Sequence, residues 1–177
     1  MSVCFLNNEY VLLSEAKVSV LDRGFIFGDA VYEVLPAFEG KFFALAQHLE
    51  RLNDNLKKVS IDPPYSSKEW EALLATLSEK NGNSDLSFYI QVTRGVAERN
   101  HFFPMDCKPT VFVMCTNLKS SSSPLIKSCI TRSDNRWGRC DIKTTSLLPN
   151  LMLKNEALLS DAFEVILLKN GMLTEGA

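Results

Sequence analysis

The stretch Cys140-Asp-Ile-Lys-Thr-Thr-Ser-Leu-Leu-Pro-Asn150 places one lysine between an isoleucine and two threonines, just before a run with helical character. An ordinary surface lysine needs no such setting. A nucleophilic lysine does, because its amine reacts only when neutral and desolvation favours the neutral form. Lys143 is therefore the first candidate functional residue, although an exposed loop lysine is the commoner interpretation of any lysine taken alone.

The composition is that of an ordinary globular protein. Of the 177 residues, 46% are hydrophobic and 23% are charged, and the net charge is -2. Acidic and basic residues are interspersed, so no basic stripe indicates a nucleic-acid partner. The first ten residues lack the features of a signal peptide, and no apolar run approaches the length of a membrane span. We therefore expect a cytoplasmic protein with no nucleic-acid or membrane partner.

The cysteines indicate neither a metal site nor a disulfide framework. They are odd in number and widely spaced, without a Cys-x-x-Cys pair. Reduced thiols and no bound metal are the expectation for Cys4, Cys107, Cys115, Cys129 and Cys140.

Local patterns predict an N-terminal α+β domain over residues 1–118. Two hairpins are expected around Asn7 to Glu9 and Glu39-Gly40, separated by a glycine-containing loop. Helical spacing of leucines and the capping-box pair Ser66 and Glu69 predict two helices after the second hairpin. The predicted strands are 3–6, 10–13, 30–38, 41–45, 86–93 and 110–116, the helices are 46–59 and 66–80, and the loop is 19–29.

A serine-rich segment ending in proline, residues 119–124, predicts a linker to a second domain. Residues 125–177 are expected to contribute a strand, the Lys143 segment, a helix over 148–161 and a strand over 164–168. So small a unit buries a core poorly. We therefore expect 125–177 to be the first part of a larger C-terminal domain that is incomplete in this chain.

Four ordered motifs resemble those of the fold-type IV pyridoxal-phosphate enzymes, which include the D-amino-acid and branched-chain aminotransferases. They are Asp22-Arg-Gly-Phe-Ile-Phe-Gly-Asp-Ala-Val-Tyr-Glu-Val34, His48-Leu-Glu-Arg-Leu52, the Lys143 segment and Thr174-Glu-Gly176. The resemblance runs from about Ser19 to Ala177. It implies the two-domain α+β fold of that family and pyridoxal 5'-phosphate as cofactor.

The resemblance also implies roles for single residues. Lys143 matches the lysine that forms an imine with the cofactor, and Arg51 matches the ligand of its phosphate. Glu175 matches the acid that keeps the pyridine nitrogen protonated, so that the ring accepts electrons from the substrate. In the family, further phosphate ligands follow the Thr-Glu-Gly turn, and this chain stops at Ala177.

A substrate class is implied by the segment Val92-Thr-Arg-Gly-Val-Ala-Glu-Arg-Asn-His-Phe-Phe-Pro104. It resembles the D-amino-acid aminotransferase loop in which an Arg-x-His pair, together with a tyrosine, holds the substrate carboxylate. Arg99, His101 and Tyr32 match these three residues, and a guanidinium can grip a carboxylate bidentately. Without the family, an exposed loop tip would be the better interpretation of Arg99 and His101.

We therefore expect transamination between a D-amino acid and a 2-oxo acid, in a homodimer. The dimer follows from the family, where the Arg-x-His loop reaches into the neighbouring subunit's site. The alternatives are a branched-chain aminotransferase or an aminodeoxychorismate lyase on the same scaffold, and a non-catalytic α+β module. Strand alternation also predicts that Glu33 points away from the face of Tyr32.

Overall fold

The computed structural model describes residues 2–118 and 126–177, so the predicted linker 119–124 lies outside the described residues. The chain divides into two compact units. The first is Met1–Lys119 with Ile142–Ser146, and the second is Ser120–Asp141 with Leu147–Ala177. The Lys143 segment, expected within 125–177, therefore belongs to the first unit, because Ile142 is buried in that unit's core.

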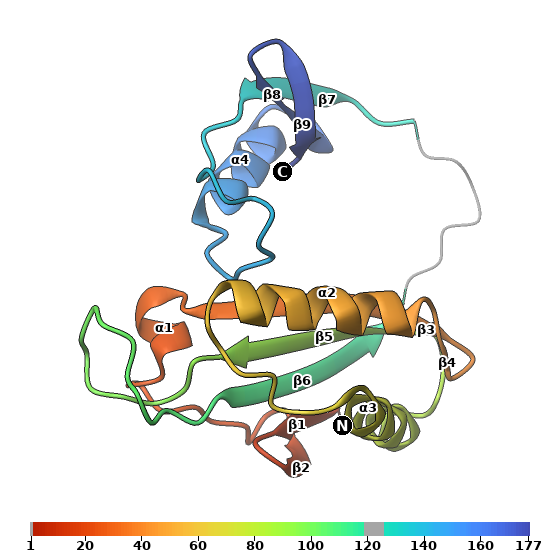
Figure 1. Cartoon of the computed structure of the whole chain (residues 1–177). Helices are drawn as coiled ribbons and strands as arrows, with labels where there is room; N and C mark the ends of the chain where they lie inside the picture. Colours follow the sequence, from red (N-terminus) through yellow and green to blue (C-terminus); the bar gives the residue numbers. More distant parts are fainter. Residues whose placement is uncertain (1, 119–125) are drawn as a thin grey trace. The chain divides into compact units, whose positions relative to one another are not determined.

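The first unit is built on a six-stranded antiparallel sheet with the strand order β2-β1-β6-β5-β3-β4 (Figure 1). Two tight hairpins confirm the predicted turns. Asn7 and Asn8 have φ of 48° and 73°, and Glu39 and Gly40 have φ of 47° and 75°, the left-handed conformation of two-residue hairpin loops. The strands are β1 (Val3–Leu6), β2 (Glu9–Leu12), β3 (Ala30–Phe38), β4 (Lys41–Phe42), β5 (Leu86–Thr93) and β6 (Thr110–Asn117).

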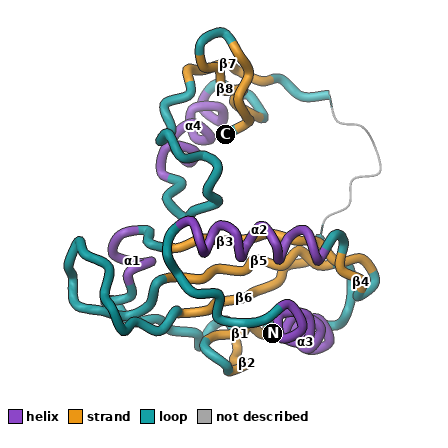
Figure 2. The backbone as a smooth tube through the Cα atoms, in the orientation of Figure 1, coloured by secondary structure: helices purple, strands orange, loops and turns teal. Residues whose placement is uncertain are grey.

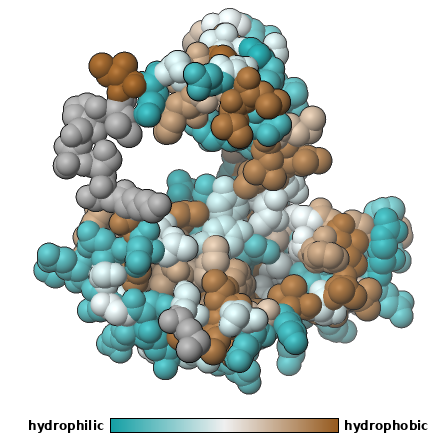
Figure 3. Space-filling model, turned by 180° about the vertical axis from the view of Figure 1, so that it is seen from behind, coloured by the Kyte–Doolittle hydropathy of each residue, from teal (hydrophilic) through white to brown (hydrophobic). Residues whose placement is uncertain are grey.

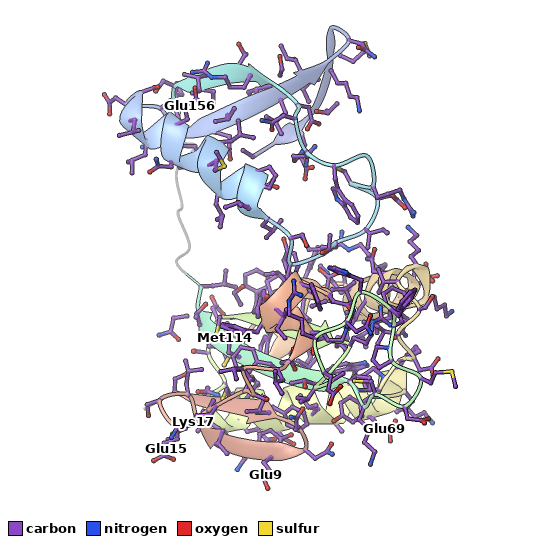
Figure 4. The ribbon with its side chains drawn as sticks, turned by 90° about the vertical axis from the view of Figure 1, so that its left-hand side faces the viewer. Glu9, Glu15, Lys17, Glu69, Met114 and Glu156 are labelled. Carbon is purple, nitrogen blue, oxygen red and sulfur yellow. The ribbon has the colours of Figure 1, made fainter. Side chains whose placement is uncertain are left out.

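Helices α2 (Leu45–Lys58) and α3 (Ser67–Lys80) pack on one face of this sheet. The predicted capping box starts α3: Ser66 Oγ accepts from the Glu69 N–H, and Glu69, labelled in Figure 4, accepts from the Ser66 N–H at 2.7 Å. Leucines on one side of each helix meet the inward residues of the strands. The largest buried side chains of this core include Trp70, Phe88, Leu35, Leu52, Leu56, Leu74 and Leu77.

A short helix that the sequence patterns did not predict, α1 (Arg23–Phe27), interrupts the expected loop over 19–29. Asp22 caps it by accepting from the Gly24 N–H at 2.8 Å, and Gly28 ends it with φ 66°. Five residues give too little periodicity for a pattern to be detected. The long connection between β5 and β6, a teal loop in Figure 2, runs beside α1.

The second unit is a parallel strand pair with an antiparallel third strand. β7 (Cys129–Ser133) runs parallel to β8 (Glu164–Lys169), α4 (Leu148–Leu159) lies between them in sequence, and β9 (Met172–Gly176) pairs with β8. Arg132 of β7 donates to Glu156 of α4, labelled in Figure 4, at 2.6 Å. The buried core of this unit is Leu153, Ala157, Val165 and Leu167.

Large apolar side chains remain exposed on both units (Figure 3). On α4 they are Leu148, Leu151, Met152, Leu158 and Leu159, each more than 60% exposed. Across the described residues, no helix combines the length and the apolar character that crossing a membrane requires.

Candidate active site

The segment that carries Lys143 lies along the free edge of β3. Val31 and Thr144 form an antiparallel bridge, the Tyr32 N–H donates to the Lys143 carbonyl at 3.0 Å, and the Thr145 N–H donates to the Ala30 carbonyl at 3.2 Å. Side chains of an extended segment alternate between the two faces. Ile142 and Thr144 accordingly face inward and are buried, which leaves Lys143 on the face of Tyr32.

The amine of Lys143 meets the phenol of Tyr32. Lys143 Nζ lies 3.2 Å from Tyr32 Oη and 4.3 Å from the centre of the Tyr32 ring. The side chain is half-buried, and none of the described carboxylates forms an ion pair with it.

A second tyrosine supports Tyr32 from the neighbouring strand. The rings of Tyr32 and Tyr89 stack with their centres 5.5 Å apart, and Tyr89 Oη donates to Gln91 Oε1 at 2.8 Å. Burial, with a smaller contribution from Tyr32, raises the pKa of Tyr89 to about 12. Tyr89 is therefore neutral and donates a hydrogen bond to Gln91. Its ring, fixed in this way, stacks on the ring of Tyr32 and keeps it beside Lys143.

Arg51 is fixed by Glu33 on the other side of β3. Its Nε and Nη2 donate to the two carboxylate oxygens of Glu33 at 2.7 Å each. The Glu33 side chain is fully buried, whereas 54% of the Arg51 side chain is exposed. His48 Nδ1 lies 3.2 Å from Glu33 Oε1. No bond joins Nη1 of Arg51 to any described residue, so this end of the guanidinium is available to an anion.

The Glu33–Arg51 pair stabilises the charged form of both groups. Burial alone would raise the pKa of Glu33, but hydrogen bonds from Arg51 and from the Val34 N–H outweigh it and hold that pKa below its ordinary value. The hydrogen bond to Glu33 likewise raises the pKa of Arg51. Glu33, which sequence reasoning assigned only to the opposite face from Tyr32, is thus the residue that orients Arg51.

Asn55 is a buried residue that sequence reasoning missed. Its side chain is 3% exposed; Oδ1 accepts from the Lys143 N–H at 3.1 Å, and Nδ2 donates to the Arg51 carbonyl at 2.7 Å. A signal was present in the sequence, because Asn55 falls at helical spacing between Leu52 and Leu56 on the apolar side of α2. A polar residue in such a stripe is expected to have specific partners.

Arg99 and His101 lie together on the β5–β6 loop, against Phe27 of α1. The Arg99 guanidinium carbon is 5.3 Å from the centre of the Phe27 ring, and the His101 and Phe27 ring centres are 5.8 Å apart. Within the described part of the first unit, neither residue forms a hydrogen bond, an ion pair or a ring contact with Tyr32 or Lys143. The structure therefore brings Tyr32 to Lys143, and it places Arg99 and His101 each against Phe27.

Buried ion pairs anchor this loop. Arg94 donates twice to Asp29, at 2.8 and 2.9 Å, and its guanidinium carbon lies 3.6 Å from the centre of the Phe103 ring. Arg23 also donates to Asp29 at 2.8 Å and to the Asn100 carbonyl at 2.7 Å. The loop is therefore held on both sides of Arg99, at Arg94 before it and at Asn100 and Phe103 after it.

Glu175 lies on β9 of the second unit and is held by Arg136. Nη1 of Arg136 donates to Glu175, and its Nη2 donates to Asp134 at 2.9 Å. The hydrogen bonds from Arg136 hold the pKa of Asp134 far below its usual range. Thr174 Oγ1 also donates to Asp134, at 2.7 Å. Glu175 is therefore positioned within its own unit, and its role beside a cofactor stays a prediction.

Comparison with known proteins identifies the family. The profile of the class IV aminotransferases matches residues 30–177. The chain belongs to this family. Class IV aminotransferases are dependent on pyridoxal phosphate. The resemblance to the fold-type IV enzymes and the predicted α+β architecture are thereby confirmed.

Individual relatives agree with this assignment. The D-alanine aminotransferase of Staphylococcus epidermidis is 37% identical over 180 residues, which cover 100% of this chain and 64% of that protein. The branched-chain amino acid aminotransferase of Escherichia coli superposes with a TM-score of 0.89 at 21% identity, over 99% of this chain and 62% of that one.

A hypothetical aminotransferase from Mycobacterium tuberculosis in a PLP-bound form superposes with a TM-score of 0.82 at 17% identity, over 99% and 65% of the two chains. At these identities the two structures show the shared fold. The chain thus spans less than two thirds of the length of the proteins that it matches.

The residues of the first unit fit pyridoxal phosphate. Lys143 offers an amine that has no acidic partner among residues 2–118 and 126–177, and Arg51 offers the Nη1 end of a guanidinium that Glu33 already orients. A phosphate dianion requires donors of this kind. Both groups sit on rigid elements, since Arg51 is on α2 and Lys143 is bonded to β3.

Proposed function

We propose that this chain carries the attachment lysine of a pyridoxal-phosphate-dependent enzyme that transfers an amino group between a D-amino acid and a 2-oxo acid. The observation that carries the proposal is the Lys143 amine, held 3.2 Å from Tyr32 Oη with no carboxylate partner in the part of the chain that the structure describes. Membership of the class IV aminotransferases supports it. The D-amino-acid part rests on the D-alanine aminotransferases that are 37–38% identical to the whole chain.

In this proposal Lys143 has two tasks. Lys143 would hold the cofactor covalently through Nζ, and the same nitrogen, when free of the cofactor, would take the proton from the substrate α-carbon and pass it to the cofactor carbon. The bound cofactor supplies a ring that accepts the electron pair left on the α-carbon. Tyr32 accepts a hydrogen bond from the charged amine, or donates one to the neutral amine, and so keeps Nζ at one place through both states.

Arg51 would hold the cofactor phosphate through Nη1, with Glu33 preventing the guanidinium from turning away. Glu175 would hold the proton on the pyridine nitrogen, with Arg136 fixing its carboxylate. Each proposed ligand has a partner that sets its orientation, and pre-orientation of this kind lowers the cost of binding.

Arg99, His101 and Tyr32 would bind the substrate carboxylate. Because Arg99 and His101 contact Phe27 rather than Tyr32 or Lys143, we propose that a second copy of the chain brings its Arg99 and His101 to this Lys143. If each copy supplies its Arg99 and His101 to the Lys143 of the other, the two copies are related by a two-fold axis and form a homodimer. With the carboxylate anchored on one side, only one enantiomer directs its α-hydrogen at Nζ.

The test uses the intact purified protein with added pyridoxal phosphate. Borohydride reduction should place the cofactor adduct on Lys143 in a mass-spectrometric peptide map, and D-alanine or D-glutamate should be an amino donor to 2-oxoglutarate. An adduct on another lysine would reject the assignment of Lys143. Use of L-leucine in place of the D-amino acids would instead favour the branched-chain alternative.

A further inference from the structure

We propose that Asn55 is a positioning residue that fixes the distance between Lys143 and Arg51, and hence between the two points where the cofactor is held. The inference rests on the proposed function. It starts from the two hydrogen bonds of one side chain, Oδ1 to the Lys143 N–H at 3.1 Å and Nδ2 to the Arg51 carbonyl at 2.7 Å. Both proposed cofactor residues are thus joined through Asn55.

An asparagine at position 55 is not the residue that folding alone would favour. Asn55 is 3% exposed on the same side of α2 as Leu52 and Leu56. Leucine has the higher helix propensity and would bury its side chain at a gain, whereas a buried amide costs free energy unless it is hydrogen-bonded. Its two hydrogen bonds offset that cost. An asparagine at this position is therefore explained by the Lys143 N–H and the Arg51 carbonyl that it binds, and not by packing in the core.

Asn55 replaces a hydrogen bond that the Lys143 segment would otherwise make with β3. Because Tyr32 donates to the Lys143 carbonyl, a continued antiparallel ladder would have the Lys143 N–H donate back to Tyr32. That N–H instead donates to Asn55 Oδ1. The Thr144 N–H meanwhile donates to the Ile142 carbonyl at 2.9 Å, which makes a three-residue turn centred on Lys143. Asn55 therefore holds the backbone of that turn.

Arg51 is held at both its side chain and its backbone. Its guanidinium is oriented by Glu33, and its carbonyl accepts from the same Asn55 side chain that holds the Lys143 N–H, so the backbone at Arg51 is tied to the Lys143 segment. Sites that must match a rigid ligand need such support around the residues that touch it. Asn55 touches neither the substrate nor the cofactor in this scheme, and acts only through the residues that do.

The experiment compares Asn55→Ala with Asn53→Ala in the intact protein. Asn53 is the matched control, because it lies on the same helix and its Oδ1 is buried without any partner among the described residues. Asn55→Asp is a rescue variant, since its carboxylate keeps an acceptor for the Lys143 N–H but loses the donor to Arg51. Three quantities are measured: the exchange rate of the Lys143 amide hydrogen without cofactor, the Kd for pyridoxal phosphate, and Tm.

Asn55→Ala is expected to speed exchange of the Lys143 amide roughly tenfold, as for one lost hydrogen bond, and to raise the Kd for pyridoxal phosphate by roughly the same factor. The Phe88 amide in the sheet centre should be unaffected. Asn53→Ala should change neither quantity, and Asn55→Asp should keep the Lys143 amide protected. Equal effects of Asn55→Ala and Asn53→Ala on exchange and on Kd would overturn the inference.

Failure of the proposed function has a different signature. A wild-type protein that takes up no pyridoxal phosphate would reject that function, whereas the exchange comparison still decides whether Asn55 holds the Lys143 backbone. If Asn55→Ala lowers Tm and speeds exchange at Phe88 as much as at Lys143, the residue only stabilises the fold, and the positioning role is wrong.

Discussion

Tyr32 and Glu33 are neighbours in β3, and their side chains leave the sheet on opposite faces. Tyr32 Oη lies 3.2 Å from the amine of Lys143, while the Glu33 carboxylate is fully buried against Arg51, with both contacts at 2.7 Å. One dipeptide therefore supports both proposed cofactor residues, and strand alternation keeps their environments apart.

Removal of the Tyr32 hydroxyl should affect chemistry more than stability. Tyr32→Phe keeps the ring stacked on Tyr89 but removes the partner of Lys143 Nζ, so we expect kcat to fall roughly tenfold, the effect of one hydrogen bond to a charged group. Tyr89→Phe is the control, because Gln91 is the hydrogen-bond partner of its hydroxyl among the described residues. A loss of kcat in Tyr89→Phe alone would contradict this view of the two phenols.

Substitutions at Arg51 and Glu33 should change the stability of the protein and its affinity for the cofactor independently. Arg51→Met leaves the buried Glu33 carboxylate with only the Val34 N–H and His48 as partners among the described residues. It should destabilise the protein by about 2 kcal/mol, less than for a fully buried pair because 54% of the Arg51 side chain is exposed. Adding Glu33→Gln should recover most of that stability without restoring affinity for pyridoxal phosphate. Urea unfolding and cofactor titration measure the two quantities; recovery of both would remove Arg51 from the phosphate site.

Acid should weaken the first unit through Glu33. The pKa of Glu33 is lowered by folding from an ordinary value of 4.5, so its contribution is fully present above that value and is lost as the pH falls through the depressed folded pKa. The difference in unfolding free energy between wild type and Glu33→Gln should therefore shrink as the pH falls from 7 toward 3. A difference that does not depend on pH would show that the charge of Glu33 contributes nothing.

Phe27 should influence substrate affinity through Arg99 and His101, which both lie against its ring. Phe27→Ala is expected to raise KM for D-alanine about threefold, the value of one exposed cation–π contact, with borohydride trapping at Lys143 unchanged. Phe25→Ala is the control on the same short helix, because Phe25 is 71% exposed. Equal KM changes in both variants would show a general effect of α1.

A shared site predicts complementation between two inactive chains. Lys143→Ala and Arg99→Ala should each be inactive, and their mixture after subunit exchange should regain roughly a quarter of the wild-type activity. Half of the dimers are then mixed, and one of the two sites in each mixed dimer is intact. Mixed dimers that form but stay inactive would reject the exchange of Arg99 between subunits.

Local patterns were sufficient where the structure depends on neighbours in sequence. The turn residues Asn7 and Asn8 and the capping box of Ser66 with Glu69 were found because such devices act within four residues. The pairing of the Lys143 segment with β3 was not found, since it joins residues more than 100 positions apart. Residue patterns carry no register between segments so distant.

The site was predictable only in part for the same reason. Tyr32 and Lys143 were selected from motifs, and the structure brings them into contact. The roles of Glu33 and Asn55 depend on which carbonyl or guanidinium faces them across the fold. Asn55 left a signal as a polar residue in an apolar stripe, but its partners could not be read from α2 alone.

The assignment of Ile142–Ser146 to the first unit, with Asp141 and Leu147 in the second, has a consequence for attempts to divide this protein. A fragment ending at residue 118 would keep Tyr32, Glu33 and Arg51 but lose the five residues that cover the edge of β3. The backbone N–H of Tyr32 and the carbonyl of Ala30 would then be unpaired at a bare strand edge, which invites pairing with another molecule. Such a fragment should aggregate unless a peptide containing residues 142–146 is supplied, because no single cut in the chain divides it into its two units.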